Sequence, residues 1–513
     1  MQDHHIMMVS DLPEEEQGFA RPSHIRYALR HLRMLPSPYQ SDDSNRITFG
    51  FFALSSLAIL GALDRLDLTE RANYIDWIYR RWNHKIGGFG GAPNIDLRGL
   101  GPDEEPCDHP HLAHTYTALL ILALLTLPSN ERPEPESPYE LSAAEWQASL
   151  RRINSPAHEE LDLICSEFPY SFGSFPDGTD EDVRFVYCAI AILAMIRVDP
   201  GKVIDVNSTE RFLKSCRRYE GGYGQAPHCE AQGGTTYCAL ASLALLGRLE
   251  SSQTEEEADQ TVRWLVDRQG EVVDSSGISP ERDIEDAAKG SQPTARGPGI
   301  PSLPHESNKL SGTNDQPTPI DGVPPTSRRT VAGFQGRIGK PLDACYSFWC
   351  TAGLTIMSRR GSTQDLNLST SHHNPSAARH CLRTDVEDPI SPPVLYDPHA
   401  NIQFLLRCQS SQWGGIARSP GDHPATNLRL LTNHILIQSN PDVYHTYLAL
   451  ASLSLSNHSA AAAVISTLEH QVGPDNRSTG DLDQLLTLHD PLLNVPLEVS
   501  NWIFKCFAPK KST

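Results

Sequence analysis

Positive charge is scarce in this chain of 513 residues. The 43 Lys and Arg residues stand against 63 Asp and Glu residues, which gives a formal net charge of -20. A surface for nucleic acid or for an anionic membrane would need a local cluster of basic residues, and the sequence shows none. The composition therefore argues against nucleic acid as a partner.

Long apolar runs and a leader segment are also lacking. The longest apolar runs, residues 118–125 and 188–196, fall far short of the roughly 20 residues that span a bilayer. The first residues lack the basic-then-apolar order of a signal peptide. The 11 cysteines are odd in number and scattered, which is typical of reduced thiols rather than of a disulfide framework. We therefore expect a soluble, cytoplasmic protein without a transmembrane segment.

Strand-like alternation is sparse, whereas apolar residues recur at helical spacing. One sequence pattern is repeated along the chain. It consists of a glycine-aromatic turn followed by a helix-like run that opens with an aromatic and a small residue. The turns lie at residues 87–91, 221–224, 333–334 and 413–416, and the runs carry the markers Tyr116, Tyr187, Tyr237, Tyr346 and Tyr447. The shortest marker spacing, about 50 residues, predicts one helical hairpin per repeat and an all-α fold.

Two segments lengthen the spacing between repeats. Residues 270–331 are rich in Ser, Pro, Gly, Thr and charge, and residues 358–395 have a similar composition. Such segments cannot bury a core. We predict that both are disordered insertions in a single domain.

Asp343 and Cys345 form the first candidate site, because a carboxylate and a thiolate close in sequence can both ligate zinc. Pro341 is favoured just before a helix, so we expect Asp343 at the helix boundary and Cys345 in the first turn, where the helix dipole favours a thiolate. His445 opens the equivalent run one repeat later. Three such ligands would leave a fourth position open, as in catalytic zinc sites. The alternative is a buried structural cysteine with a satisfied core histidine.

Arg337 and Lys340 precede this motif. A guanidinium and an ammonium beside a metal could hold a phosphate leaving group, and the alternative is two solvated loop charges. The glycine-rich turns themselves are better explained as hairpin turns than as phosphate-binding loops, because no strand precedes them and no Lys-Ser/Thr pair follows.

Residues 333–349 resemble the zinc and diphosphate motif of protein prenyltransferase β subunits. The similarity continues through residues 182–188, 230–238 and 441–447 and through a tail at residues 490–495, and outside the insertions it covers most of residues 22–500. The resemblance implies an α/α toroid, or α6-α6 barrel, around an apolar funnel over residues 22–510. It also implies transfer of an isoprenyl group from its diphosphate to the cysteine thiol of C-terminal CaaX proteins such as small GTPases. The implied partner is a helical α subunit in an obligate heterodimer.

The resemblance assigns roles to individual residues. Asp343, Cys345 and His445 would hold one Zn2+ per β subunit, and the substrate thiol would take the open position as a thiolate. The residues implied at the diphosphate are Arg337, Lys340, Tyr346 and Gln232. Those implied at the isoprenoid are Thr48, Arg184, Tyr187, Cys238 and Trp349. Those implied at the peptide are His111, Ala113, Phe185 and Tyr444.

Three positions favour the type I geranylgeranyl enzyme over the farnesyl enzyme. Thr48 falls where farnesyl enzymes place a Trp that shortens the lipid pocket. Arg418 falls where the farnesyl enzyme has an Asp linked to Mg2+, so a fixed cation could replace that metal and Mg2+ would not be required. The sequence of residues 182–187 resembles that of the type I enzyme. The expected lipid donor is therefore geranylgeranyl diphosphate.

Other features keep alternatives open. Gln232 replaces the diphosphate-binding His of the family, and Tyr444 is more like the farnesyl enzyme. The alternatives are a farnesyltransferase β subunit and a non-catalytic helical scaffold with the same fold. A toroid terpene cyclase is disfavoured because no Asp-x-Asp-Asp motif is found.

Residues 425–440 separate two stretches that run together in the family. Because this segment interrupts a short loop before His445, we hypothesise a gene-model error such as a retained intron. Peptides recovered from within the segment of the endogenous protein would refute this hypothesis.

Overall fold

The computed structural model describes residues 18–83, 88–91, 110–127, 182–272, 331–360, 394–420, 441–468 and 486–506. The chain divides into one unit formed by Met1–Glu271 with Val331–Thr513 and a second unit, Val272–Thr330. The helices and strands described below all belong to the first unit.

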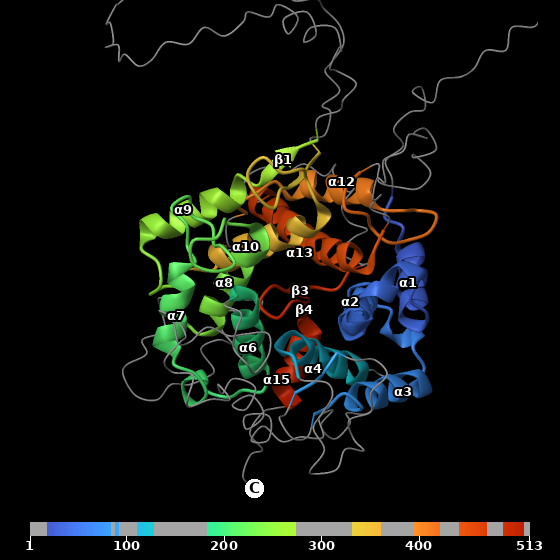
Figure 1. Cartoon of the computed structure of the whole chain (residues 1–513). Helices are drawn as coiled ribbons and strands as arrows, with labels where there is room; N and C mark the ends of the chain where they lie inside the picture. Colours follow the sequence, from blue (N-terminus) through green and yellow to red (C-terminus); the bar gives the residue numbers. More distant parts are fainter. Residues whose placement is uncertain are drawn as a thin grey trace, which may run out of the picture. The chain divides into compact units, whose positions relative to one another are not determined.

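Six inner helices contact one another in a closed circuit (Figure 1). They are α2 (Arg46–Ile59), α4 (Leu112–Thr126), α6 (Val183–Met195), α8 (Gly233–Leu245), α10 (Ala344–Ser358) and α13 (Val443–Leu468). Each contacts the next in this order, and α13 contacts α2. The inner helices are apolar on more than one face, and in α4 nearly every side chain is buried. Such helices must be covered on several sides, which the ring provides.

The outer helices each pack on the inner helix that follows in the chain. They are α1 (Arg21–Arg33) on α2, α3 (Leu68–Tyr79) on α4, α7 (Val206–Ser215) on α8, α9 (Glu255–Val266) on α10 and α12 (Pro398–Cys408) on α13. Side-chain caps mark the starts of α3, α7, α9 and α12, for example the capping box of Thr254 and Glu257 at α9. The predicted all-α fold of helical hairpins is confirmed. None of the described helices combines the length and apolarity needed to cross a membrane.

Short elements complete the described chain. The 3-10 helices are η2 (Ser37–Asn45), η3 (Leu63–Arg65) and η5 (Pro200–Lys202), and the C-terminal helix is α15 (Leu497–Cys506). Two small antiparallel sheets pair β1 (Gln269–Glu271) with β2 (Ala332–Phe334) and β3 (His489–Asp490) with β4 (Val495–Pro496).

The glycine-aromatic turns lead from outer to inner helices, as predicted. The apolar residue of each turn is fully buried, with 0% exposure for Phe89, Tyr223, Phe334 and Ile416. Gly221 has a φ of +109°, and a Cβ there would lie 2.3 Å from the carbonyl oxygen of Gln260. Only glycine fits such a position.

The strand pair β1–β2 corrects one boundary. Gly270 and Glu271, assigned from composition to the first insertion, belong to β1 and pair with Gly333 and Ala332. Composition could not reveal this pairing because the partner strand lies on the far side of the insertion. The remaining residues of 270–331 and 358–395, apart from 272, 331, 358–360 and 394–395, lie outside the described residues, as does all of 425–440.

The structure also corrects the repeat marker of the fourth run, Tyr346, which is not equivalent in position to the other marker tyrosines. Tyr116, Tyr187 and Tyr237 each lie five residues after the N-cap residue of their helix, and in α10 that position holds Phe348, not Tyr346. The ring of Phe348 lies 5.5 Å from that of Tyr237. The run contains three aromatics, Tyr346, Phe348 and Trp349, and only the helix start shows which of them is equivalent to the other marker tyrosines.

Buried tyrosine hydroxyls hold the segment between β3 and β4, which lies within the ring of inner helices (Figure 1). Tyr116 Oη donates to the carbonyl of Leu493 at 2.7 Å, and Tyr187 Oη donates to that of Leu492 at 2.9 Å. Tyr447 Oη bonds to the backbone and side chain of Asn494. The repeat tyrosines therefore satisfy backbone groups that would otherwise be buried without partners.

We expect Tyr187→Phe to lower the free energy of unfolding by about 1–3 kcal/mol, because it leaves the buried Leu492 carbonyl without this donor. Urea denaturation of the purified protein measures the change. Tyr219→Phe is the control, since Tyr219 is 88% exposed and should change stability by less than about 0.5 kcal/mol. Equal stabilities for the two variants would contradict the role given to the hydroxyl.

Candidate functional site

The start of α10 carries two of the three predicted metal ligands. Asp343 is the N-cap residue, with extended backbone at φ -148°, and its Oδ1 accepts a hydrogen bond of 2.9 Å from the Cys345 backbone N–H. Cys345 lies in the first turn, as predicted. Both are buried, at 5% and 4% exposure. The cap hydrogen bond holds the carboxylate over the end of the helix, beside the thiol.

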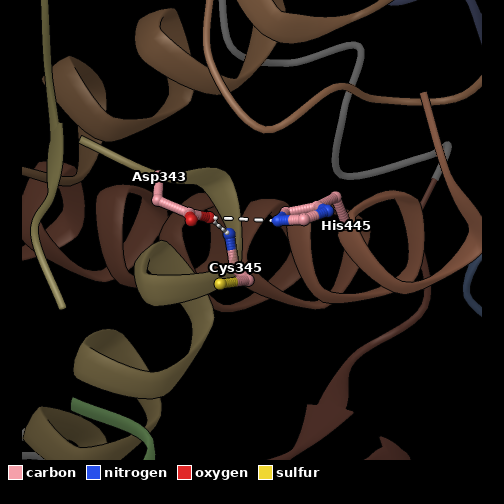
Figure 2. Close-up of side chains that lie close together, drawn as sticks. All are labelled: Asp343, Cys345 and His445. Atoms are coloured by element: carbon pink, nitrogen blue, oxygen red, sulfur yellow. Dashed lines mark hydrogen bonds and ion pairs between the residues drawn. The ribbon is translucent and has the colours of Figure 1, made fainter. Parts of the chain in front are cut away.

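His445 comes from the first turn of α13, the inner helix next to α10 in the ring. Its Nε2 lies 3.3 Å from Asp343 Oδ1, and the carboxylate and the imidazole face each other beside Cys345 (Figure 2). On its other side, Nδ1 lies 2.6 Å from Asp442 Oδ2, while Asp442 Oδ1 accepts the backbone N–H of His445. Asp442 therefore orients the imidazole.

The sequence analysis gave Asp442 no role. The spacing of Asp442 and His445 could have indicated this role. An aspartate three residues before a histidine at a helix start can cap the helix and also reach the imidazole of that histidine. Metal-ligating histidines usually donate their second ring N–H to a carboxylate.

The donor set fits zinc. One ligand atom each from Asp343, Cys345 and His445 lies within 4.8 Å of the others. Carboxylate oxygen, thiolate sulfur and imidazole nitrogen are the ligands that zinc takes. Bonds of about 2.0–2.1 Å in a tetrahedral site place oxygen and nitrogen ligands roughly 3.3 Å apart, which matches the 3.3 Å between Asp343 Oδ1 and His445 Nε2. Three protein ligands leave a fourth position for substrate.

The surroundings of the triad favour the protonated forms of Cys345 and His445. Burial raises the pKa of the Cys345 thiol to about 12. The expected effect of the helix dipole on this thiol is therefore outweighed by burial. Burial by itself lowers the pKa of His445, but the carboxylates of Asp343 and Asp442 outweigh it and raise that pKa to about 12. A metal ion would bind the deprotonated forms and release these protons.

Arg418 lies directly beside the triad. Its Nε donates to Asp343 Oδ2 at 2.8 Å, and its side chain is 50% exposed. Its backbone carbonyl accepts the N–H of Ala344, and Ser419 Oγ donates to the carbonyl of Leu342. The arginine is therefore tied to the segment that carries the ligands.

The structure brings three of the four diphosphate candidates together at the start of α8. Tyr346 Oη donates to Gln232 Oε1 at 3.2 Å, and the N–H of Gly233 donates to the carbonyl of Gly336 at 2.9 Å. Arg337 follows Gly336 in the turn before α10. The fourth candidate, Lys340, is exposed later in the same turn.

Glu230 forms an ion pair with Arg337, with 2.7 Å between Oε2 and Nη1. The sequence analysis did not single out this glutamate. Glu230 and Arg337 are far apart along the chain, so the sequence does not indicate their contact. The contact arises only when the turn before α10 packs on the start of α8.

Aromatic side chains from four inner helices gather near Trp349. Trp349 Nε1 donates to Tyr444 Oη at 3.3 Å, and the indole ring lies 5.1 Å from the ring of Tyr237. The ring of Tyr444 lies 5.5 Å from that of Phe52, which is one turn after Thr48 on α2. Thr48 and Trp349 are both half-buried. This grouping is compatible with an apolar substrate chain.

The other isoprenoid candidates lie on α6 and α8. Arg184 pairs with the N-cap residue Asp182 at 2.5 Å, and its side chain is 56% exposed. Cys238 is buried, which raises the pKa of its thiol well above the ordinary value. The hydroxyl of Tyr187 donates a hydrogen bond to the carbonyl of Leu492, as described above. Its structural role is therefore evident.

The peptide candidates fall into two groups. His111 and Phe185 lie in edge-to-face contact with ring centroids 5.5 Å apart, and His111 Nδ1 accepts the N–H of Ala113. Tyr444 belongs instead to the aromatic group around Trp349. The first group lies at the starts of α4 and α6, whereas the second comes from α2, α8, α10 and α13.

Residues 19–495 match the family profile described as the prenyltransferase alpha-alpha toroid domain. The chain belongs to this family. The match spans the closed ring of hairpins and the three ligands at its inner helices. The predicted α/α toroid is thereby confirmed.

The chain is similar both to subunits of geranylgeranyl transferases and to a subunit of a farnesyltransferase. The geranylgeranyl transferase type-1 subunit beta of Arabidopsis thaliana is 26% identical over 460 residues, covering 85% of each protein. Its Dictyostelium discoideum counterpart is 25% identical, covering 86% of this chain and 92% of that protein. The protein farnesyltransferase subunit beta of Schizosaccharomyces pombe is 26% identical, covering 86% and 79%.

A solved structure shares the fold. The Candida albicans protein geranylgeranyltransferase-I complexed with GGPP aligns with a TM-score of 0.58 and 21% identity. The alignment covers 96% of this chain and all of the other. The resemblance to the family inferred from residues 333–349 is thus confirmed at the level of fold and family.

We expect Asp442→Asn to weaken zinc affinity by about 10–100-fold, because it removes the charge that orients and polarises His445. Competition with a fluorescent zinc chelator measures the affinity, starting from a wild-type protein with one zinc per chain. Asp205→Asn is the control, since Asp205 caps α7 with no ligand beside it. An unchanged affinity for Asp442→Asn would contradict the role assigned to this carboxylate.

Proposed function

We propose that this chain is the β subunit of a protein geranylgeranyltransferase type I. It would transfer a geranylgeranyl group from geranylgeranyl diphosphate to the cysteine thiol of C-terminal CaaX proteins, such as small GTPases. The observation that carries the proposal is the convergence of Asp343, Cys345 and His445 beside the Arg337 turn. The catalytic domain is residues 22–510, and the working enzyme is a cytoplasmic heterodimer with an α subunit.

In this proposal Asp343, Cys345 and His445 hold one zinc ion. A bound zinc ion supplies the positive charge that keeps the substrate cysteine a thiolate at neutral pH. The thiolate sulfur forms a bond to carbon 1 of the isoprenoid while the bond from that carbon to oxygen breaks. The diphosphate leaves with the electron pair.

The chain's own residues assist the departure. Arg337, Lys340, Tyr346 and Gln232 offer donors to the diphosphate as negative charge builds on it. Donors held in place stabilise this charge better than water does, because they need no reorganisation during the step. Arg337 would exchange its ion pair with Glu230 for one with the diphosphate.

The aromatic group around Trp349, with Arg184, Tyr187 and Cys238, would contact the lipid. His111, Ala113, Phe185 and Tyr444 would contact the CaaX peptide. Thr48, a small residue on α2, leaves room for a fourth isoprene unit, which supports geranylgeranyl over farnesyl. Arg418 would supply the cation that Mg2+ supplies in farnesyl enzymes, so Mg2+ is not required.

A farnesyltransferase β subunit is the second candidate. The similarity to the Schizosaccharomyces pombe protein and the tyrosine at position 444 support it. A non-catalytic scaffold, the third reading of the sequence, predicts a protein without bound zinc.

We expect the chain, co-expressed with its α subunit, to transfer geranylgeranyl in zinc buffered with EDTA and without Mg2+. Paired assays with farnesyl and geranylgeranyl diphosphate on a CaaX peptide ending in Leu measure the preference. Faster farnesyl transfer that requires millimolar Mg2+ would favour the second candidate. Zinc binding without transfer of either lipid would contradict both enzymatic proposals.

We expect Thr48→Trp to shift the preference toward farnesyl diphosphate by at least about tenfold in kcat/KM, because an indole would occupy the end of the lipid pocket and exclude one isoprene unit. Thr48→Val is the matched control and should keep the geranylgeranyl preference. A Thr48→Trp enzyme with unchanged selectivity would place the end of the pocket elsewhere.

A further inference from the structure

We propose that Tyr27 and Tyr39, which belong to the first hairpin, are positioning residues for the metal ligand His445 in the last one. They hold the backbone on both sides of Asp442, the residue that orients the imidazole. The inference rests on the zinc site of the proposed function. It makes the place of His445 independent of residues 425–440, which directly precede this backbone.

Both peptide units of Asp442 are held by a phenol hydroxyl. The unit before it offers the carbonyl of Pro441, which accepts a hydrogen bond of 2.7 Å from Tyr27 Oη. The unit after it offers the N–H of Val443, which donates to Tyr39 Oη at 3.1 Å. This N–H belongs to the first residue of α13, where the helix itself provides no acceptor. The φ and ψ angles of Asp442 are the rotations between these two units, so both angles are fixed.

Asp442 passes this placement on to His445. Its Oδ1 accepts the N–H of His445 at 2.8 Å, and its Oδ2 lies 2.6 Å from Nδ1 of the imidazole. Thr446 closes the same turn, because its N–H donates to the carbonyl of Asp442 at 3.0 Å and its Oγ1 accepts the N–H of Ile416 at 2.9 Å. The imidazole is thus held by contacts that begin outside the metal site.

The ring of Tyr27 is fixed by the glycine turn that leads to α13. A Cβ on Gly415 would lie 2.8 Å from both Tyr27 Cε2 and Pro441 Cβ. The N–H of Gly415 donates to Nδ1 of the buried His24 on α1 at 3.0 Å, which ties that helix to the turn. Tyr27 is itself only 3% exposed. Its hydroxyl therefore has a fixed position against the Pro441 carbonyl.

Tyr39 is held by aromatic contacts within the first hairpin. Its ring meets those of Phe49 and His31 edge to face, with centroids 4.9 Å and 5.8 Å apart. Such contacts favour one orientation of the ring. Because both tyrosines come from the start of the chain, the ligand of the last hairpin is positioned only when the ring of helices closes.

The order of the chain separates His445 from the segment before it. The held backbone begins at Pro441, directly after residues 425–440. A change in that segment reaches His445 along the chain only through the held peptide units. The zinc site should therefore tolerate both the presence and the absence of the segment.

The test uses the full chain co-expressed with its α subunit, and competition with a fluorescent zinc chelator measures the zinc affinity. We expect Tyr27→Phe and Tyr39→Phe each to weaken this affinity by about fivefold, because each leaves one peptide unit of Asp442 without its hydrogen bond. The absorption spectrum of Co2+ bound in place of zinc reports the ligand geometry and should change in both variants.

Tyr116→Phe is the matched control. Tyr116 is also buried, and its Oη donates to a backbone carbonyl, that of Leu493, over the same 2.7 Å. This variant should lower the thermal midpoint about as much as Tyr27→Phe does but leave the zinc affinity and the Co2+ spectrum unchanged. Replacing residues 425–440 by a Gly-Ser linker of the same length, or deleting them, should also leave both unchanged.

Equal losses of zinc affinity in Tyr116→Phe and Tyr27→Phe would show that the affinity follows stability, and the inference would be overturned. Wild-type affinity in either Tyr27→Phe or Tyr39→Phe would overturn it as well, and so would a loss of affinity in a folded chain with the linker. A wild-type complex without bound zinc would contradict the proposed function itself, and this is seen before any variant is made.

Discussion

The burial of the six inner helices on more than one face is the constraint on which the rest of the structure depends. Helices as apolar as α4 cannot lie on a surface, and each is covered by its two neighbours in the ring and, where the partner is described, by an outer helix. The order of the helices in the ring places α10 beside α13. Their first turns then meet, and with them the carboxylate, thiol and imidazole of the candidate metal site.

One position of the repeat, the N-cap of the inner helix, serves both stability and chemistry. At α6, Asp182 caps the helix and pairs with Arg184. At α10, Asp343 makes the same cap hydrogen bond while its second oxygen faces Arg418 and its first lies beside His445. At α13, Asp442 caps the helix and holds the imidazole. A residue type that is favoured for capping thus also supplies a candidate metal ligand, Asp343, and the carboxylate that holds His445, Asp442.

The segment between β3 and β4 is held inside the ring by hydrogen bonds as well as by apolar packing. Tyr116, Tyr187 and Tyr447 donate hydrogen bonds to the segment between β3 and β4. Each hydroxyl satisfies a buried backbone carbonyl or side chain. Because the tyrosines come from three inner helices, their hydroxyl contacts also fix how those helices lie around the segment. The aromatic group near Trp349 is built on α2, α8, α10 and α13 and shares only α13 with these three helices.

The sequence alone determined the repeat and the all-α class, because these depend on local periodicity. It also named Asp343, Cys345 and His445 as candidate ligands, chiefly through the resemblance of their surroundings to a family motif. Asp343 and Cys345 could be placed at a helix start from Pro341 and the cap preference of aspartate. The marker Tyr346 was wrong because periodicity cannot tell two nearby aromatics apart without the helix start. Asp442, Glu230 and the pairing of Tyr346 with Gln232 were decided only by the tertiary structure. Their partners lie on other hairpins or depend on rotamers, and only packing of the ring brings such groups within hydrogen-bond distance.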